Sequence, residues 1–175
     1  MILEDRVRRV TLLVLDVDGV LTDGGIVYTD AGDELKRFHV RDGAGLKLWR
    51  AAGHKVAVIS GRRSKAVERR MAELGVSSVL LGREEKGRAL AEVLAATGVA
   101  ADQCCAVGDD LPDLPVLHAC GVAVAVADAC PEVRAAADHV TMLSGGHGAV
   151  REVVEWLLKS QGVWDALTAG HSPAG

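Results

Sequence analysis

Thr11-Leu12-Leu13-Val14-Leu15 runs directly into Asp16-Val17-Asp18-Gly19. The first five residues are mostly apolar, which predicts a buried strand. The two carboxylates then stand at the carboxyl end of that strand. Ligands bind at this edge of a parallel α/β sheet, and a side chain at a strand tip is held more firmly than one on a free loop. Asp16 and Asp18 are therefore candidate functional residues, although a solvated turn at Gly19 explains the same short sequence.

The chain has 175 residues, of which 49% are apolar, enough for the core of one domain. Its net charge of −4 excludes the basic footprint of a nucleic-acid or acidic-membrane partner. No apolar run reaches the roughly twenty residues of a membrane span, and no cleavage signal is visible, so we expect a cytoplasmic protein. The cysteines match no zinc spacing and are expected to be reduced: Cys104, Cys105, Cys120 and Cys130.

Strand-like and helix-like segments alternate along the chain, which predicts an α/β fold with a doubly wound parallel sheet. The predicted strands are 11–15, 55–59, 78–81, 103–107 and 122–126. The predicted helices lie near 43–52, 64–74, 85–97, 113–119 and 148–159. Residues 24–38 interrupt this rhythm and are predicted to form a projecting β-hairpin, a flap rather than a domain. We expect one domain over residues 1–160 and a flexible tail over residues 161–175.

Polar side chains follow three further predicted strands. Ser60-Gly61-Arg62 offers a hydroxyl and backbone N–H groups for an anion, Lys86 follows the third strand, and Gly108-Asp109-Asp110-Leu111-Pro112-Asp113 follows the fourth. Each has an ordinary alternative, namely a helix cap, a surface lysine or a turn. Because the carboxyl ends of parallel strands share one edge of a sheet, the whole set predicts a functional site.

These residue types fit phosphoryl transfer. A carboxylate such as Asp16 can attack phosphorus and form an aspartyl-phosphate, which divides hydrolysis into two easier steps. A Mg²⁺ ion bound by oxygens of both acidic loops would offset the repulsion between carboxylate and phosphate. Lys86 and the Ser60 hydroxyl would hold phosphate oxygens. Asp18 is placed to protonate the leaving oxygen and later to deprotonate the attacking water.

The motifs DVDGVLTDG, ISGR, Lys86 and GDDLPDLPVL, in this order, resemble the four motifs of the haloacid dehalogenase superfamily of phosphatases. Within it, the chain most resembles the 3-deoxy-D-manno-octulosonate 8-phosphate phosphatases, a branch without a cap domain, from about Val10 to Leu158. The resemblance implies a Rossmann-like core. It also implies a Mg²⁺-dependent phosphatase that releases 3-deoxy-D-manno-octulosonate for lipopolysaccharide assembly.

The same resemblance assigns roles to the motif residues. It makes Asp16 the nucleophile, Asp18 the acid/base, and Ser60 and Lys86 the residues that bind the phosphate. The implied metal ligands are Asp16, the carbonyl of Asp18 and Asp109, with Asp113 supporting the metal site.

An eight-carbon acid sugar needs cations and hydrogen-bond donors for its carboxylate and hydroxyls. The candidate substrate-binding residues, beside Asp18 and Lys86, are His39, Arg41, Asp42, Gly43, Lys47, Arg62 and Arg70. An ordinary surface position is the alternative for the arginines, and a structural role is the alternative for His39. The sequence departs from the family pattern at His39, where asparagine is usual, at Ala44, where an aromatic is common, and at Leu81, where glutamine is common.

The resemblance also implies a homotetramer, because a neighbouring subunit would close a site that the hairpin alone leaves open. Ile26, Val27 and Tyr28 would be exposed on a monomer, which favours such an assembly. Two alternatives remain: a phosphatase for a nine-carbon ulosonate 9-phosphate, and a non-catalytic domain that serves in oligomer assembly. The complete set of acidic residues favours the enzyme.

Overall fold

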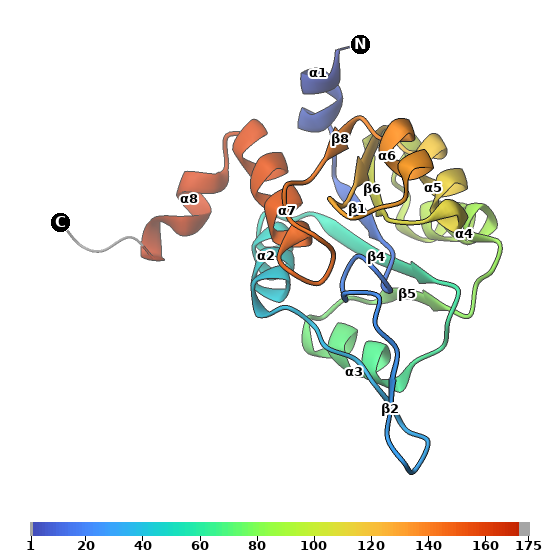
Figure 1. Ribbon diagram of the computed structural model, residues 1–175. Helices are drawn as coiled ribbons and strands as arrows, with labels where there is room; N and C mark the ends of the chain where they lie inside the picture. Colours follow the sequence, from blue (N-terminus) through green and yellow to red (C-terminus); the bar gives the residue numbers. More distant parts are fainter. Residues whose placement is uncertain (1, 172–175) are drawn as a thin grey trace.

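The computed structural model describes residues 2–171 and contains a six-stranded parallel sheet in the order β5-β4-β1-β6-β7-β8 (Figure 1). The strands are β1 (Leu12–Leu15), β4 (Lys55–Ser60), β5 (Ser78–Leu81), β6 (Cys104–Gly108), β7 (Val122–Ala125) and β8 (His139–Val140). All five predicted strands are confirmed. Helices cover both faces of the sheet, as the prediction of a doubly wound α/β fold requires.

β1 lies in the middle of the sheet and pairs with β4 and β6, so that Leu13 stands opposite Val56 and Cys105. Its four residues are all buried, as expected for a strand covered on both faces. From β1 the chain adds β4 and β5 on one side and then returns to add β6, β7 and β8 on the other. The strand order therefore reverses at β1, and open α/β sheets bind ligands at the carboxyl ends of the strands at such a point.

Right-handed crossovers place the helices of each half of the sheet on opposite faces. One face carries α2 (Val40–Ala51), α3 (Lys65–Glu73) and α7 (Ala149–Ser160), and the other carries α4 (Lys86–Thr97), α5 (Leu114–Ala119) and α6 (Pro131–Ala136) (Figure 1). Gly45 of α2 lies directly against Arg151 and Val154 of α7, so these two helices pack closely. This contact fixes the start of α7 beside the start of α2.

The predicted hairpin is present and consists of β2 (Val27–Tyr28) and β3 (Glu34–Leu35), which pair antiparallel. It projects away from the sheet at its carboxyl edge (Figure 1). Its apolar side chains are exposed in the single chain: Ile26, Val27, Tyr28 and Leu35 are all more than half exposed. The hairpin is therefore not held by a hydrophobic contact of these side chains with the core.

Four short elements were not predicted from the sequence. They are β8, α6, α1 (Leu3–Arg8) and α8 (Trp164–Thr168). The charged run at residues 4–9 lies largely in α1, which exposes Glu4, Asp5 and Arg8 to solvent and buries Val7. None of the four exceeds six residues, so none contains enough of a period to be recognised.

The segment after residue 160 also differs from the predicted flexible tail. Trp164 begins α8 and lies 5.2 Å from the Arg151 guanidinium carbon and 5.3 Å from the Lys159 amine, measured to the ring centre. Cation–π contacts with two side chains of α7 thus accompany the short helix. The rest of the tail prediction, for residues 172–175, falls outside the described residues.

Cys104 and Cys105 lie in the core, and Cys120 and Cys130 pack against it. All four cysteines are unpaired, and Cys104 and Cys105 are buried in β6, as predicted for reduced core cysteines. Among residues 2–171 no helix has the length and apolar character needed to cross a membrane.

Candidate active site

The carboxyl edge of the sheet brings together the acidic and basic residues that the sequence singled out. Asp16 follows β1 directly, Ser60 is the last residue of β4, and Lys86 begins α4. Asp109 follows β6, and Asp113 ends the short 3₁₀ helix at Leu111–Asp113. Residues as far apart in the sequence as Asp16 and Asp113 thus meet because the four neighbouring parallel strands β5, β4, β1 and β6 end at one edge.

Lys86 is the buried cation of the site. Its amine donates to Asp16 Oδ1 at 2.7 Å and to Asp113 Oδ1 at 2.6 Å, and its side chain is 7% exposed. Burial alone would lower the pKa of Lys86, but the Asp16 and Asp113 carboxylates raise it above its ordinary value. The lysine therefore stays charged and fixes the orientation of Asp16.

One lysine does not neutralise the acidic cluster. Carboxylate oxygens of Asp16, Asp109 and Asp113 all lie within 4.8 Å of one another. Burial, and then repulsion from Asp113, raise the pKa of Asp16 to about 6. Burial, and then repulsion from Asp16 and Asp113, raise the pKa of Asp109 to about 8. The protein alone thus holds these carboxylates in an environment that disfavours their ionised forms.

The same cluster fits a hard divalent cation. Asp109 Oδ1 is buried and accepts no hydrogen bond from any described residue. Asp113 Oδ2, by contrast, accepts from the backbone N–H groups of Asp109 and Asp110, at 3.0 and 3.4 Å, so its own place is fixed. An oxygen-only cluster with an unsatisfied buried carboxylate oxygen matches the ligand preference of Mg²⁺ rather than that of zinc.

Gly19 lets the Asp16 loop approach the Asp109 loop. Its φ of +91° is unfavourable for other residues, and a Cβ there would lie 2.1 Å from Asp109 Oδ2. Gly145 supports the loop from the far side, since a Cβ at Gly145 would lie 1.6 Å from the carbonyl oxygen of Gly19. The two glycines explain how both acidic loops come within reach of one cation.

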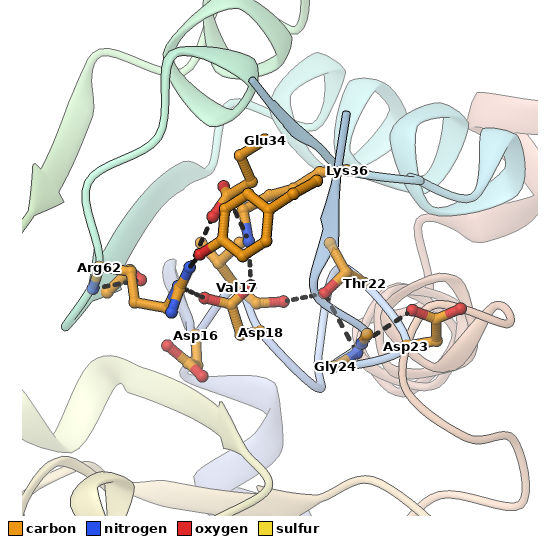
Figure 2. A network of polar contacts seen from close by, with 12 residues as sticks. Asp16, Val17, Asp18, Thr22, Asp23, Gly24, Glu34, Lys36 and Arg62 are labelled. Carbon is orange, nitrogen blue, oxygen red and sulfur yellow. Dashed lines mark hydrogen bonds and ion pairs between the residues drawn. The ribbon is translucent and has the colours of Figure 1, made fainter. Parts of the chain in front are cut away.

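Asp18 points away from the cluster and toward the hairpin (Figure 2). Asp18 Oδ1 accepts a hydrogen bond from Lys36, and its Oδ2 lies 3.7 Å from Arg62 Nε. Arg62 in turn donates to Glu34 Oε2 at 2.6 Å. Its backbone N–H donates to the Ser60 hydroxyl at 3.2 Å. The two carboxylates of the DxD motif therefore face different partners, as two different chemical tasks require.

A cleft of about 370 Å³ opens over these groups. Its lining includes seven predicted site residues: Asp16, Asp18, Ser60, Arg62, Lys86, Asp109 and Asp113. This volume suits a small phosphorylated ligand.

Comparisons with known proteins agree with this geometry. A family model of haloacid dehalogenase-like hydrolases matches residues 82–153. The chain is 44% identical to the 3-deoxy-D-manno-octulosonate 8-phosphate phosphatase of Haemophilus influenzae, over 91% of this chain and 89% of that protein. It is 45% identical to the Escherichia coli phosphatase of the same name, over 91% of this chain and 85% of the relative.

The chain belongs to the 3-deoxy-D-manno-octulosonate 8-phosphate phosphatase family. A crystal structure of the Moraxella catarrhalis phosphatase, in complex with a magnesium ion, a phosphate ion and a KDO molecule, superposes with a TM-score of 0.94 at 40% identity and covers 97% of both chains. The cobalt-bound Haemophilus influenzae phosphatase superposes with a TM-score of 0.90 at 42% identity, covering 95% of this chain and 99% of that one.

Most of the predicted sugar-binding residues lie outside the cleft of this phosphatase fold. Arg41 is exposed and lines a second hollow with Met142, Leu143 and Arg151. Lys47 is exposed on α2. Of the basic side chains proposed for the sugar, Arg62 alone lines the cleft of the single chain.

Three further candidate sugar-binding residues, Arg70, Gly43 and His39, contact other parts of their own chain. Arg70 packs against Gly43, where a Cβ would lie 2.3 Å from the arginine, and it pairs with Glu73 at 3.3 Å. His39 precedes α2 and lies beside Gly148, and its buried Nδ1 has no hydrogen-bond partner among the described residues. Within one chain these side chains support the contact between helices rather than the phosphate cleft.

Asp42 differs most from its predicted contact with substrate. It is 2% exposed, and its Oδ1 accepts a hydrogen bond at 2.8 Å from the backbone N–H of Arg151, in the first turn of α7. Burial raises the pKa of Asp42, and this hydrogen bond opposes the rise. The carboxylate thus caps α7 from the neighbouring helix.

Two residues of the hairpin that were not among the predicted site residues, Glu34 and Lys36, contact Arg62 and Asp18. The sequence does place these two residues on one face of the hairpin, because they alternate with Leu35 and Arg37 and successive side chains of a strand point to opposite faces. Glu34 in β3 and Lys36 just after it lie on one charged face, but the sequence does not say which face meets the catalytic loop.

The position of Asp42 leads to a prediction about stability. Asp42→Ala should lower the free energy of unfolding by about 1–2 kcal/mol, since α7 loses a cap. Asp42→Asn keeps the acceptor oxygen and should recover most of that loss. Urea denaturation measures both, and steady-state kinetics should give an unchanged KM for the folded variants. A raised KM at wild-type stability would instead make Asp42 a substrate ligand.

Proposed function

We propose that this chain hydrolyses 3-deoxy-D-manno-octulosonate 8-phosphate to 3-deoxy-D-manno-octulosonate and phosphate, through an aspartyl-phosphate on Asp16, in lipopolysaccharide precursor synthesis. The observation that carries the proposal is the cleft in which Asp16, fixed by Lys86, faces the Asp109 loop, while Asp18 stands apart at the hairpin. A nucleophile and a separate acid/base are the two groups that this hydrolysis needs.

In the first step a carboxylate oxygen of Asp16 forms a bond to phosphorus. The bond between phosphorus and the C8 oxygen of the sugar breaks, and Asp18 gives its proton to that oxygen. In the second step Asp18 takes a proton from water, whose oxygen attacks phosphorus. The bond from phosphorus to Asp16 then breaks, phosphate leaves, and both carboxylates return to their starting states.

The remaining residues of the cleft stabilise charge. Lys86 and the Ser60 hydroxyl hold the equatorial phosphate oxygens, over which the charge of the transition state is spread. Asp16, Asp109 and the carbonyl of Asp18 hold Mg²⁺, and Asp113 supports this site through its contacts with Lys86 and the Asp109 loop. The bound ion supplies a positive charge that draws the phosphate to the carboxylates.

We assign the sugar carboxylate to Arg62, the one proposed sugar-binding cation that lines the cleft. A guanidinium binds a carboxylate through two parallel hydrogen bonds. Glu34 occupies Arg62 at 2.6 Å in this structure, so substrate binding requires exchange of one carboxylate partner for another.

The assembly and compartment are further parts of the proposal. A homotetramer, in which a second copy walls each site, is supported by the exposed apolar hairpin. It is also supported by Arg41 and Lys47, which are exposed and are not among the residues that line the cleft of their own chain. A cytoplasmic location is supported by the four unpaired cysteines, because disulfides are rare in reducing compartments.

Replacement of the two motif carboxylates tests the chemistry. Asp16→Asn should abolish turnover with the fold intact, because an amide does not attack phosphorus. Asp18→Asn should lower kcat by about 10²–10⁴-fold, the usual contribution of a positioned acid/base. Asp30→Asn, at the exposed hairpin turn, is the matched control and should behave as wild type. Phosphate release measures all three, and substantial activity of Asp16→Asn would refute the covalent mechanism.

Removal of the metal tests the acidic cluster. EDTA should eliminate phosphate release, and added Mg²⁺ should restore it, whereas Ca²⁺ should support turnover poorly because its coordination shell is larger and looser. Asp109→Asn should need a higher Mg²⁺ concentration for half-maximal activity. Full activity in a metal-free preparation would contradict the arrangement.

A change on the hairpin tests the assembly. Val27→Asp should dissociate the oligomer, because a carboxylate would replace one of the exposed apolar side chains that we expect to pack between copies. It should also raise the KM for the sugar phosphate. Light scattering and steady-state kinetics measure these effects, and a fully active wild-type monomer would disprove a shared site.

A further inference from the structure

The hairpin turns two of its charged side chains, Glu34 and Lys36, inward and exposes its apolar side chains, the reverse of what hydrophobic burial alone would produce. Glu34 and Lys36 lie on one face of β3 and its extension, with side chains 17% and 1% exposed. Leu35 and Arg37 lie on the other face, and the Arg37 side chain is 73% exposed. A segment that turns its charged face inward must meet opposite charges there, since an unpaired buried charge is costly.

Lys36 meets this requirement at Asp18. Its amine donates a hydrogen bond to Asp18 Oδ1 and lies 3.4 Å from Glu34 Oε1 (Figure 2). Glu34 also accepts from Arg62 at 2.6 Å, and Arg62 Nε lies 3.7 Å from Asp18 Oδ2. The four side chains form a ring in which acidic and basic groups alternate. The hairpin is thus joined to the catalytic loop by ion pairs and not by apolar contact.

The ring restricts the Asp18 carboxylate at one oxygen. Lys36 holds Oδ1, while Oδ2 has its nearest recorded cation at 3.7 Å and is the less constrained of the two. Asp18 itself is 21% exposed and follows β1 on a loop, where a carboxylate without partners samples several rotamers. Proton transfer needs the donor oxygen at hydrogen-bond distance from the reacting atom, so a fixed rotamer increases the productive fraction.

We infer that Lys36 is a positioning residue, which holds Asp18 Oδ1 so that Oδ2 faces the leaving oxygen and the attacking water. The inference deepens the proposed function and rests on the role of Asp18 in it. Lys36 acts through Asp18 and does not touch substrate. The hairpin is then part of the catalytic machinery of its own chain, in addition to any contact that it makes with another copy.

Three variants separate this role from simple anchoring of the hairpin. Lys36→Met removes the charge at similar length, and Lys36→Arg keeps a cation. Arg37→Met is the matched control, because it removes the next charge of the same segment, on the opposite face, where it pairs with Asp23. Circular dichroism and light scattering establish that each variant folds and assembles as the wild type does.

The test compares the rate of the first turnover for two substrates with different leaving groups, measured by rapid mixing. The sugar alkoxide of octulosonate 8-phosphate needs the proton of Asp18, whereas the nitrophenolate of p-nitrophenyl phosphate leaves without one. Lys36→Met should slow the first turnover of the sugar phosphate by about 10–100-fold, less than loss of the acid itself. The nitrophenyl phosphate should slow by less than about threefold, the sugar KM should not change, and Lys36→Arg should recover most of the rate.

A double-mutant cycle supplies the decisive comparison. If Lys36 acts through Asp18, Lys36→Met should cause no further loss in the Asp18→Asn background. Equal slowing of both substrates, a raised KM with unchanged first turnover, or an additive loss in the double variant would each overturn the inference. So would wild-type behaviour of Lys36→Met.

Failure of the proposed function has a different signature. If the wild-type enzyme releases no phosphate from octulosonate 8-phosphate, the substrate assignment is wrong. The leaving-group comparison is then made between p-nitrophenyl phosphate and an alkyl phosphate that the enzyme does hydrolyse. In either case the role of Lys36 is decided by whether Lys36→Met slows the substrate with the alkyl leaving group more than p-nitrophenyl phosphate.

Discussion

Repulsion among three neighbouring carboxylates, two of them buried and one half-buried, is the constraint on which the site depends. Asp16, Asp109 and Asp113 lie within 4.8 Å of one another, and Lys86 is the one buried lysine that contacts the cluster within the described residues. A protein gains no stability from such a cluster by itself, because each added negative charge raises the cost of the next. The arrangement becomes favourable when a divalent cation is bound, and the cation in turn attracts an anionic phosphate. Negative charge held close together is thus what lets a carboxylate come within bonding distance of phosphorus.

The fold supplies this geometry through β1 and the loops around it. Since β1 lies between β4 and β6, the residue after it is flanked by the ends of both neighbours, and Asp16 meets Ser60 on one side and Asp109 on the other. Gly19 and Gly145 remove the side chains that would separate the acidic loops. Among residues 2–171 no cap domain covers the cleft, and the hairpin lies beside it, joined to Asp18 and Arg62 by charged contacts.

Much of the fold and of the phosphate site could be predicted from the sequence, because both depend on patterns of residues close together in the chain. Apolar runs of strand length indicate β1, β4 and β6, and polar residues directly after them must meet at one edge. Asp42 could not be predicted in this way, since its partner in α7 is 109 positions away and only packing brings them together. Lys36 was overlooked for a related reason. Its importance depends on which face of the hairpin meets the Asp18 loop, and alternation alone does not define that face.

Identification of the phosphorylated residue tests the central claim most directly. The enzyme is mixed with octulosonate 8-phosphate and Mg²⁺, quenched in acid within the first turnover, and analysed by mass spectrometry of its peptides. The account predicts a phosphoryl group on the Asp16 carboxylate that appears with Mg²⁺ and is absent when EDTA replaces it. A phosphoryl group on any other residue, or turnover of substrate during which the protein carries none, would contradict it.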